Sequence, residues 1–171
     1  AQTLLVKCDV SDEAGVRAMF DAIGVRFGRL DVLVNNAGIT APWKPRDLET
    51  LNLEEWDRVF AVNVRGMFQV TRAALPLLRK GERPCVVNTA SIVGLRPGPQ
   101  PPPYAASKAA VVNLTKTLAW NLGPEIRGRR RRAVGALVSH PERSHVWIDG
   151  GRGRVDEDVI SLRCGAFGLQ P

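Results

Sequence analysis

Short apolar runs alternate with longer amphipathic stretches along the first 126 residues of the chain. The apolar runs predict buried strands over residues 4–10, 30–35 and 85–90. Apolar positions spaced three and four apart predict helices over residues 12–27, 53–78 and 104–122. Strands that alternate with helices predict an α/β fold with a parallel sheet.

Individual residues mark the ends of these predicted helices. Ser11 is the predicted N-cap of the first helix, and Gly28 is expected to end it. Asn52 is the predicted N-cap of the second helix, which Pro76 is expected to kink or end. Gly123-Pro124 is expected to terminate the third helix.

The pattern degrades after Pro124. Residues 125–145 show no convincing periodicity, and 128–144 are predicted to form an irregular, arginine-rich segment. Residues 145–151 predict a short strand and turn, followed by a tail that runs to residue 171. We therefore expect a main domain over 1–127, an irregular segment over 128–144 and a strand with a tail over 145–171.

Composition favours an ordinary globular protein, with 44% hydrophobic and 24% charged residues in 171. No apolar run is long enough to cross a bilayer, and we see no signal-peptide pattern. Cys8, Cys85 and Cys164 are widely spaced, which predicts reduced thiols in a cytoplasmic protein. His140 and His145 are the only histidines, so a metal site is not predicted.

The net charge is +7, and five arginines fall within residues 127–132. Such a run can attract the phosphates of nucleic acids. No aromatic residues interleave with these arginines, so a base-stacking surface is not supported. We interpret the run as a solvated loop, and nucleic-acid binding is not predicted.

Three side chains suited to proton transfer are predicted to meet. Tyr104 and Lys108 are four residues apart, which places them on one helix face about 6 Å apart. An ammonium beside a phenol favours the phenolate, so the pair is suited to moving a proton. Ser91 ends a predicted strand, where parallel sheets bind their ligands. Asn63 lies on a largely apolar helix face, and taken alone it fits a satisfied core asparagine better than a catalytic one.

These motifs together resemble the short-chain dehydrogenases/reductases, and among them the bacterial 3-oxoacyl-carrier-protein-reductase-like group. The matching pieces are Asp9-Val10, Asn35-Asn36-Ala37-Gly38, Asn63 within FAVNVRGMF, Ser91 within NTASIVG, and Tyr104-Ala-Ala-Ser-Lys108. The resemblance covers residues 4–124. It implies a Rossmann-like doubly wound sheet and an NAD(P)-dependent oxidoreductase acting on a carbonyl or secondary alcohol.

The resemblance also implies roles for single residues. Tyr104 would be the general acid/base, and Lys108 would support it and bind the nicotinamide ribose. Ser91 would hold the substrate oxygen, and Asn63 would position a water near Lys108. Asp9 and Val10 would flank the adenine, and Asn35, Ala37 and Gly38 would line the cofactor, which Tyr104 and Lys108 would also contact. Helices 53–78 and 104–122 form the subunit interface in relatives, which implies a homo-oligomer.

The sequence departs from the family at both ends. It lacks the glycine-rich TGxxxGxG turn that cradles the cofactor phosphates, and it starts about where the family's third strand starts. We therefore expect an incomplete sheet without the family's first two strands, in which strand 4–10 lacks both neighbours and strand 30–35 is an open edge. The family pattern is disrupted after residue 127, and Trp147–Gly151 looks like its last strand.

These departures leave two functions open. One is an active oxidoreductase, with the choice between NAD and NADP unresolved. The other is an inactive or weakly active fragment that acts only by association with another subunit.

Overall fold

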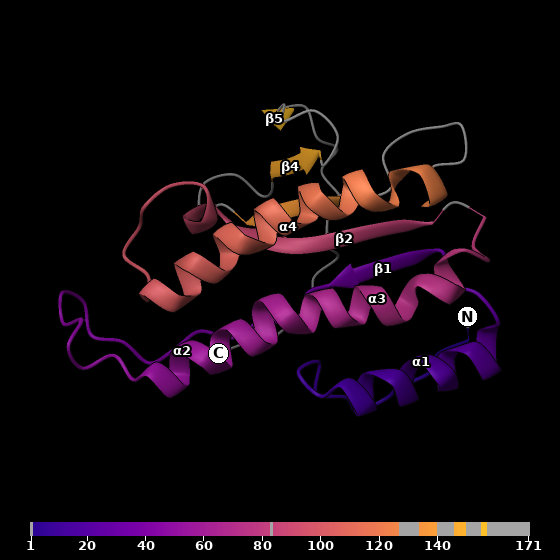
Figure 1. Ribbon diagram of the computed structural model, residues 1–171, viewed down its shortest axis with the longest axis horizontal. Coiled ribbons are helices and arrows are strands. Elements are labelled where there is room, and N and C mark those ends of the chain that lie inside the picture. Colours follow the sequence, from indigo (N-terminus) through magenta and orange to yellow (C-terminus); the bar gives the residue numbers. More distant parts are fainter. Residues whose placement is uncertain (1, 83, 127–133, 140–145, 150–154, 157–171) are drawn as a thin grey trace.

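The computed structural model describes residues 2–82, 84–126, 134–139, 146–149 and 155–156 (Figure 1). Its elements are α1 (Glu13–Phe27), β1 (Val32–Asn35), α2 (Leu53–Phe60), the π-helical η1 (Ala61–Gly66), α3 (Met67–Leu78), β2 (Cys85–Ser91), the 3₁₀-helical η2 (Ile92–Gly94), α4 (Pro102–Ile126), β3 (Val134–Ser139), β4 (Val146–Asp149) and β5 (Val155–Asp156).

The strands form one sheet in the order β1-β2-β3-β4-β5. β1, β2 and β3 are parallel, with Val34 opposite Val87 and Val87 opposite Gly135. This confirms the predicted parallel α/β arrangement. β4 and β5 each pair antiparallel with the preceding strand, so the complete sheet is mixed.

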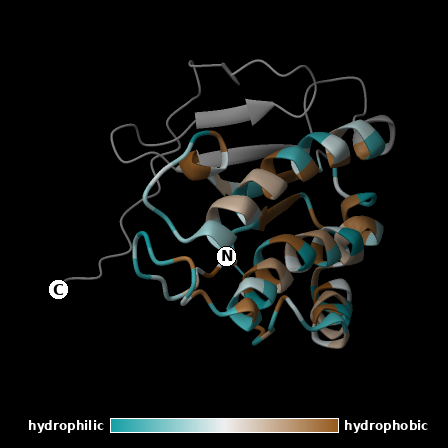
Figure 2. Ribbon diagram, turned by 60° about the vertical axis from the view of Figure 1, so that its left-hand side comes forward, coloured by the Kyte–Doolittle hydropathy of each residue, from teal (hydrophilic) through white to brown (hydrophobic). Residues whose placement is uncertain are grey.

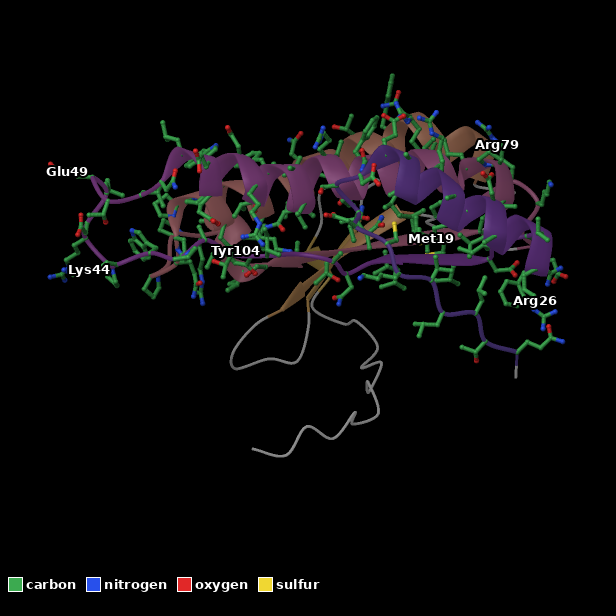
Figure 3. All side chains as sticks on the ribbon, turned by 90° about the horizontal axis from the view of Figure 1, so that it is seen from below. Met19, Arg26, Lys44, Glu49, Arg79 and Tyr104 are labelled. Atoms are coloured by element: carbon green, nitrogen blue, oxygen red, sulfur yellow. The ribbon has the colours of Figure 1, made fainter. Side chains whose placement is uncertain are left out.

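The helices α1, α3 and α4 lie on one face of the sheet (Figures 1 and 3). α4 contacts β2 and β3, α3 contacts β1 and β2, and α1 packs against α3. A doubly wound fold carries helices on both faces. Within the described residues only one of these two layers is present, so the fold is incomplete, as the sequence predicts.

The expected burial of β1 on both faces is wrong. Val32 and Val34 are 54% and 58% exposed. Among the described residues β1 pairs only with β2, so its other edge is open, and no helix covers the face that carries these two valines. The expectation of an open edge at 30–35 is confirmed.

Residues 4–10 do not form the predicted strand. Leu5 is 96% exposed. A strand forms by hydrogen-bonding to a neighbouring strand, and no strand of the described sheet pairs with this segment. The cap of α1 also differs from the prediction, because Asp12 rather than Ser11 accepts the N–H groups of Ala14 and Gly15. Gly28 ends α1 in the left-handed conformation, as expected.

The predicted helix over 53–78 is one helical rod with a wider π-helical turn, η1, in its middle. Asn52 caps it through the Glu54 N–H, as predicted. α3 contains Pro76 and ends two residues beyond it. α4 continues through Gly123-Pro124 to Ile126, so the predicted end is wrong.

The predicted irregular segment 128–144 contains β3, which is a correction. The strand forms through parallel pairing with β2, a long-range contact that local periodicity does not reveal. β4 confirms the strand predicted within 145–151. The arginine run 127–132, His140, His145 and Cys164 lie outside the described residues, and the domain boundaries stay a prediction.

The core lies between the sheet and the helices. Its buried members come from α1, α3, β2 and α4, and they include Val16, Phe20, Val70, Leu78, Val86, Val111 and Leu118. Teal and brown residues alternate along each helix, as expected for helices with one buried side (Figure 2). No helix in the described part of the chain has the length and apolar character needed to span a membrane.

Candidate active site

Tyr104 and Lys108 lie on adjacent turns at the start of α4. The helix begins with Pro102-Pro103, and proline fits the first helical turn because its missing N–H would have no partner there. The Lys108 ammonium lies 5.6 Å from the centre of the Tyr104 ring. The predicted pairing of these two side chains on one helix face is therefore present.

Lys108 is only 5% exposed. Its Nζ donates a 2.8 Å hydrogen bond to the backbone carbonyl of Thr89 in β2. Burial lowers the pKa of the Lys108 ammonium, because desolvation disfavours its charged form. An ammonium has three donors, so the bond to Thr89 leaves capacity for a ligand.

Ser91 is the last residue of β2 and is buried. The chain then turns through η2 and presses against α4. A Cβ added at Gly94 would lie 2.6 Å from the backbone carbon and oxygen of Lys108. Only glycine allows this approach, which fixes the loop after Ser91 against the turn that carries Lys108.

Asn63 lies in η1, with 2% of its surface exposed. Its Oδ1 accepts the Ile39 N–H at 2.8 Å, and its Nδ2 donates to the Ile39 carbonyl at 2.9 Å and to Ser107 Oγ at 3.0 Å. A Cβ added at Gly38 would lie 3.4 Å from both Asn63 Oδ1 and Lys108 Nζ. The structure thus brings Gly38, Asn63 and Lys108 to one place.

A cavity of about 420 Å³ lies beside this place. Its lining includes the sequence-predicted Asp9, Val10, Ala37 and Gly38. The Ser11 N–H and hydroxyl donate to one Asp9 oxygen at 2.8 and 2.7 Å. The backbone bond first, and then the hydroxyl bond, hold the pKa of the Asp9 carboxyl below its usual value. Gln69 donates to the Val10 carbonyl.

Asn35 does not join this lining. Its amide nitrogen donates to Thr71 Oγ1 at 2.9 Å and to Asn88 Oδ1 at 2.8 Å, and Asn88 in turn donates to Thr115 Oγ1 at 3.0 Å. The side chain therefore ties β1 to α3 and, through β2, to α4. Asn35 lines a second cavity, of about 280 Å³, together with Val10 and Ala37, and its predicted contact with the cofactor stays a prediction.

Sequence reasoning missed three residues of the site. Arg58 lines the cavity with Asp9, Ser107 bonds to Asn63, and Gly94 touches the backbone of Lys108. The spacing of Arg58 from Val62, another lining residue, is a signal that was available, because residues four apart share a helix face. The described residues contain no group of three or more His, Cys, Asp and Glu suited to a metal ion.

Residues 1–127 match the family model described as short chain dehydrogenase. The chain belongs to the short-chain dehydrogenase family. It is 44% identical over 118 residues to a 2-(R)-hydroxypropyl-CoM dehydrogenase of Xanthobacter autotrophicus, an alignment that covers 69% of this chain and 47% of that one. Over 126 residues it is 40% identical to a 3-oxoacyl-acyl-carrier-protein reductase of Thermotoga maritima, with 72% and 48% covered.

Solved structures of the family share the fold. A 3-ketoacyl-(acyl-carrier-protein) reductase of Brucella melitensis, crystallised with NADH, matches with a TM-score of 0.66 and 42% identity, covering 72% of this chain and 52% of that one. The Rossmann-like fold is thereby confirmed. The chain spans about half the length of the short-chain dehydrogenase relatives it matches.

Proposed function

We propose that the chain carries the catalytic residues of an NAD(P)-dependent oxidoreductase that interconverts a carbonyl and a secondary alcohol by hydride transfer. The observation that carries the proposal is the Tyr104 ring beside the buried Lys108 ammonium, at the end of β2. A phenol held against a fixed cation is a proton donor and acceptor poised for use.

The cavity residues fit the proposed cofactor. The Asp9 carboxylate offers an acceptor fixed by Ser11, and Val10 and Val62 offer apolar walls for a base. Gly38 leaves bare backbone where even a methyl group would contact Lys108 Nζ. Asp9 and Val10 would hold the adenine, with Ala37 and Gly38 beside the ribose and Lys108 at the nicotinamide end. When bound, NAD(P) supplies or accepts the hydride.

In the proposed reduction, Tyr104 gives its proton to the substrate oxygen as the carbonyl carbon gains a hydride, and in oxidation it takes that proton back. Lys108, buried and held by the Thr89 carbonyl, would stay beside the Tyr104 ring during the transfer. The Ser91 hydroxyl would donate to the same substrate oxygen and stabilise its developing charge.

The test is a cofactor titration and a turnover assay on the full chain. NADH or NADPH binding is followed by fluorescence, and turnover by absorbance with a series of small ketones. Tyr104→Phe is expected to lower turnover by about a hundredfold or more while leaving the cofactor dissociation constant unchanged. Wild-type chain that binds neither cofactor at millimolar concentration would contradict the proposal.

The second candidate function is a subunit that acts only with another. It is favoured by the exposed Val32 and Val34 on β1. A preparation that gains turnover only when mixed with an intact relative, and has none alone, would support this function over the first.

Free thiols at Cys8 and Cys85 support a cytoplasmic setting for either function.

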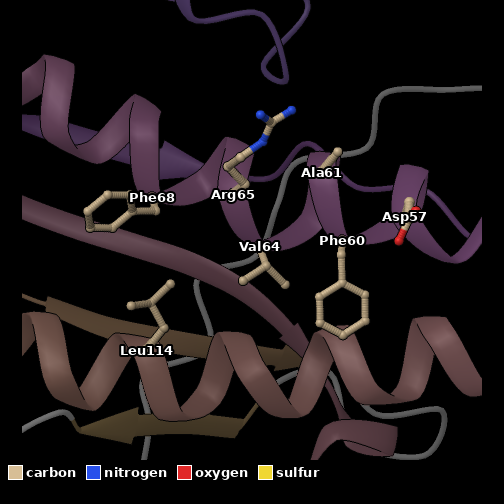
Figure 4. A pocket seen from close by; sticks show the side chains of 7 residues that line it. All are labelled: Asp57, Phe60, Ala61, Val64, Arg65, Phe68 and Leu114. Carbon is tan, nitrogen blue, oxygen red and sulfur yellow. The ribbon is translucent and has the colours of Figure 1, made fainter.

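We also propose self-association through α2–α3 and α4. A groove of about 560 Å³ runs between them, and its lining includes Phe60, Val64, Phe68 and Leu114. Phe60 and Val64 project toward α4, from which Leu114 points back (Figure 4). Sedimentation is expected to give a dimer or larger species that Phe68→Glu dissociates. A wild-type monomer would contradict this proposal.

A further inference from the structure

Ser107 is a buried hydroxyl between two parts of the site, and the proposed chemistry does not use it. The residue has 0% of its surface exposed and precedes Lys108 in α4. Its Oγ donates to the Tyr104 carbonyl at 2.7 Å and accepts from Asn63 Nδ2 at 3.0 Å. Ser107 therefore joins the turn that carries Tyr104 to η1.

The direction of each hydrogen bond in this connection is fixed. A serine hydroxyl has one proton, and the Tyr104 carbonyl can only accept, so the proton points there. Asn63 must then donate to Ser107. The Ile39 N–H and carbonyl fix the two ends of the Asn63 amide, because one can only donate and the other can only accept.

The series Ile39, Asn63, Ser107 and Tyr104, called here the Ile39–Tyr104 relay, thus ends on backbone groups at both sides. At one end the relay holds the Gly38–Ile39 loop, which lines the proposed cofactor cavity. At its other end it holds the first turns of α4. Flipping the Asn63 side-chain amide would break both of its bonds to Ile39. Only one orientation of the amide therefore satisfies every hydrogen bond of the relay.

We propose that Ser107 is a positioning residue that couples the Gly38–Ile39 loop to Tyr104. Ser107 thereby fixes the position of Tyr104, the proposed general acid/base, relative to the proposed cofactor site. The inference rests on the proposed function, in which Tyr104 is the acid/base and the cavity takes NAD(P). Ser107 itself contacts no reacting atom in this scheme.

Thr115 provides a matched control on the same helix. It too has 0% of its surface exposed, donates to a carbonyl of its own helix (Val111, at 2.7 Å) and accepts from an asparagine, Asn88, at 3.0 Å. It lies about two helical turns beyond Ser107 and away from the cavity lining. Thr115→Val removes this hydroxyl and keeps the shape of the side chain.

The experiment uses the single tyrosine of the chain as its probe. Ring-labelled tyrosine gives one NMR signal, which reports the surroundings of Tyr104 without any need for turnover. In wild-type chain we expect this signal to shift when NADH is added. Ser107→Ala is expected to move the signal in the free protein, to weaken its response to NADH and to lower kcat about tenfold, with the KM for the ketone little changed.

Two further variants test whether the hydroxyl is responsible. Ser107→Thr, which keeps it, is expected to restore the wild-type signal and response. Ser107→Cys is slightly larger and offers a weaker donor, so an intermediate result is expected. This variant replaces Ser107→Ala if the latter does not fold. Thr115→Val is expected to lower the melting temperature and to leave the Tyr104 signal unchanged.

The proposal is overturned if Ser107→Ala lowers the melting temperature as Thr115→Val does but leaves the signal and its NADH response intact. It is also overturned if folded Ser107→Thr behaves like Ser107→Ala. Asn63→Ala combined with Ser107→Ala should be no worse than the more severe single variant, and additive effects on kcat would contradict one shared relay. Wild-type chain without NADH binding would refute the proposed function, whereas the signal of the free variants still tests the relay.

Discussion

The half of the candidate site around Tyr104 and the half around Asp9 belong to one fold but are held in different ways. Lys108 and Asn63 are 5% and 2% exposed, and their hydrogen bonds reach β2, the loop after β1 and α4. Asp9 is held by Ser11, two residues away, and the nearby Leu5 is 96% exposed. Packing between distant elements buries the first half. In the second half the Asp9 carboxylate is held by local hydrogen bonds, while Gln69 holds the neighbouring Val10 carbonyl.

The same contrast runs through the sheet. Val86 in β2 has 0% of its surface exposed, whereas Val34 in β1 is 58% exposed. β2 has a strand on each side, and β1 has one neighbour among the described residues. Substitutions should therefore have large effects around β2 and α4 and small effects toward β1 and residues 4–10.

The largest effect is expected from Gly94→Ala. The new Cβ would lie 2.6 Å from backbone atoms of Lys108, which cannot move aside as a side chain can. We expect a loss of about 3 kcal/mol in the free energy of unfolding, measured by urea denaturation. Turnover should fall too, because the loop after Ser91 separates from α4.

Gly24→Ala is the control for this substitution. Its Cβ would make an ordinary 3.6 Å contact with Leu77, inside α1. Alanine is favoured over glycine within a helix, so we expect a change between zero and about 1 kcal/mol in the stabilising direction. Equal losses in the free energy of unfolding for Gly94→Ala and Gly24→Ala would contradict the close approach of Gly94 to the Lys108 backbone.

A paired substitution in the sheet should give the next largest effect. Val86→Ala removes two buried methyl groups and is expected to cost about 2 kcal/mol in the free energy of unfolding. Val34→Ala, at an exposed position of β1, is expected to change it by less than about 0.5 kcal/mol. Urea denaturation of both variants checks the difference, and equal costs would show that β1 is covered in solution.

The sequence predicted those parts of the fold that depend on neighbouring residues. The Asn52 cap, the Gly28 end and the apolar run that forms β2 follow from local chemistry. Residues 4–10 read as a strand but lack a partner to pair with, and β3 exists through its pairing with β2. The continuation of α4 past Pro124 likewise runs against the local pattern, in which Gly123-Pro124 predicts an end.

The candidate site divides in the same way. The spacing of Tyr104 and Lys108 was enough to place both on one helix face. Asn63 could be singled out as a polar residue on an apolar face, but its partners Ile39 and Ser107 are 24 and 44 residues away in sequence. Asn35 carries a family motif, yet its amide bonds to Thr71 and Asn88 in the core. A motif identifies a residue, and tertiary contacts decide what its side chain does.

A smaller effect is expected in the pH dependence of stability. Burial lowers the pKa of Lys108 in the folded state below 10.5, its usual value. As the pH rises from the folded pKa toward 10.5, the unfolded state binds more protons, so the free energy of unfolding should rise and then level off. Lys108→Met should lack this rise, and denaturation across the alkaline range checks it.

The exposed Lys116 on α4 provides the control, because Lys116→Met should keep the rise. A rise retained by Lys108→Met would contradict its assignment to Lys108.

The smallest effect is expected from Ser11→Ala. This variant keeps the backbone bond to Asp9 and removes the hydroxyl bond, so the pKa of the Asp9 carboxyl should rise part of the way toward its usual 3.8. A lowered pKa stabilises the fold at pH values above 3.8, and this contribution is lost as the pH falls through the folded value. The variant should therefore be slightly less stable than wild type near neutral pH and should equal it in strong acid. NMR titration of Asp9 checks the shift. The dissociation constant for NADH checks whether this pKa change affects cofactor binding. We expect little change, because the backbone bond from Ser11 to Asp9 remains. If Ser11→Ala weakened NADH binding more than Ser107→Ala does, the expected order of the two effects would be wrong. The exposed half of the site around Asp9 would then determine cofactor binding.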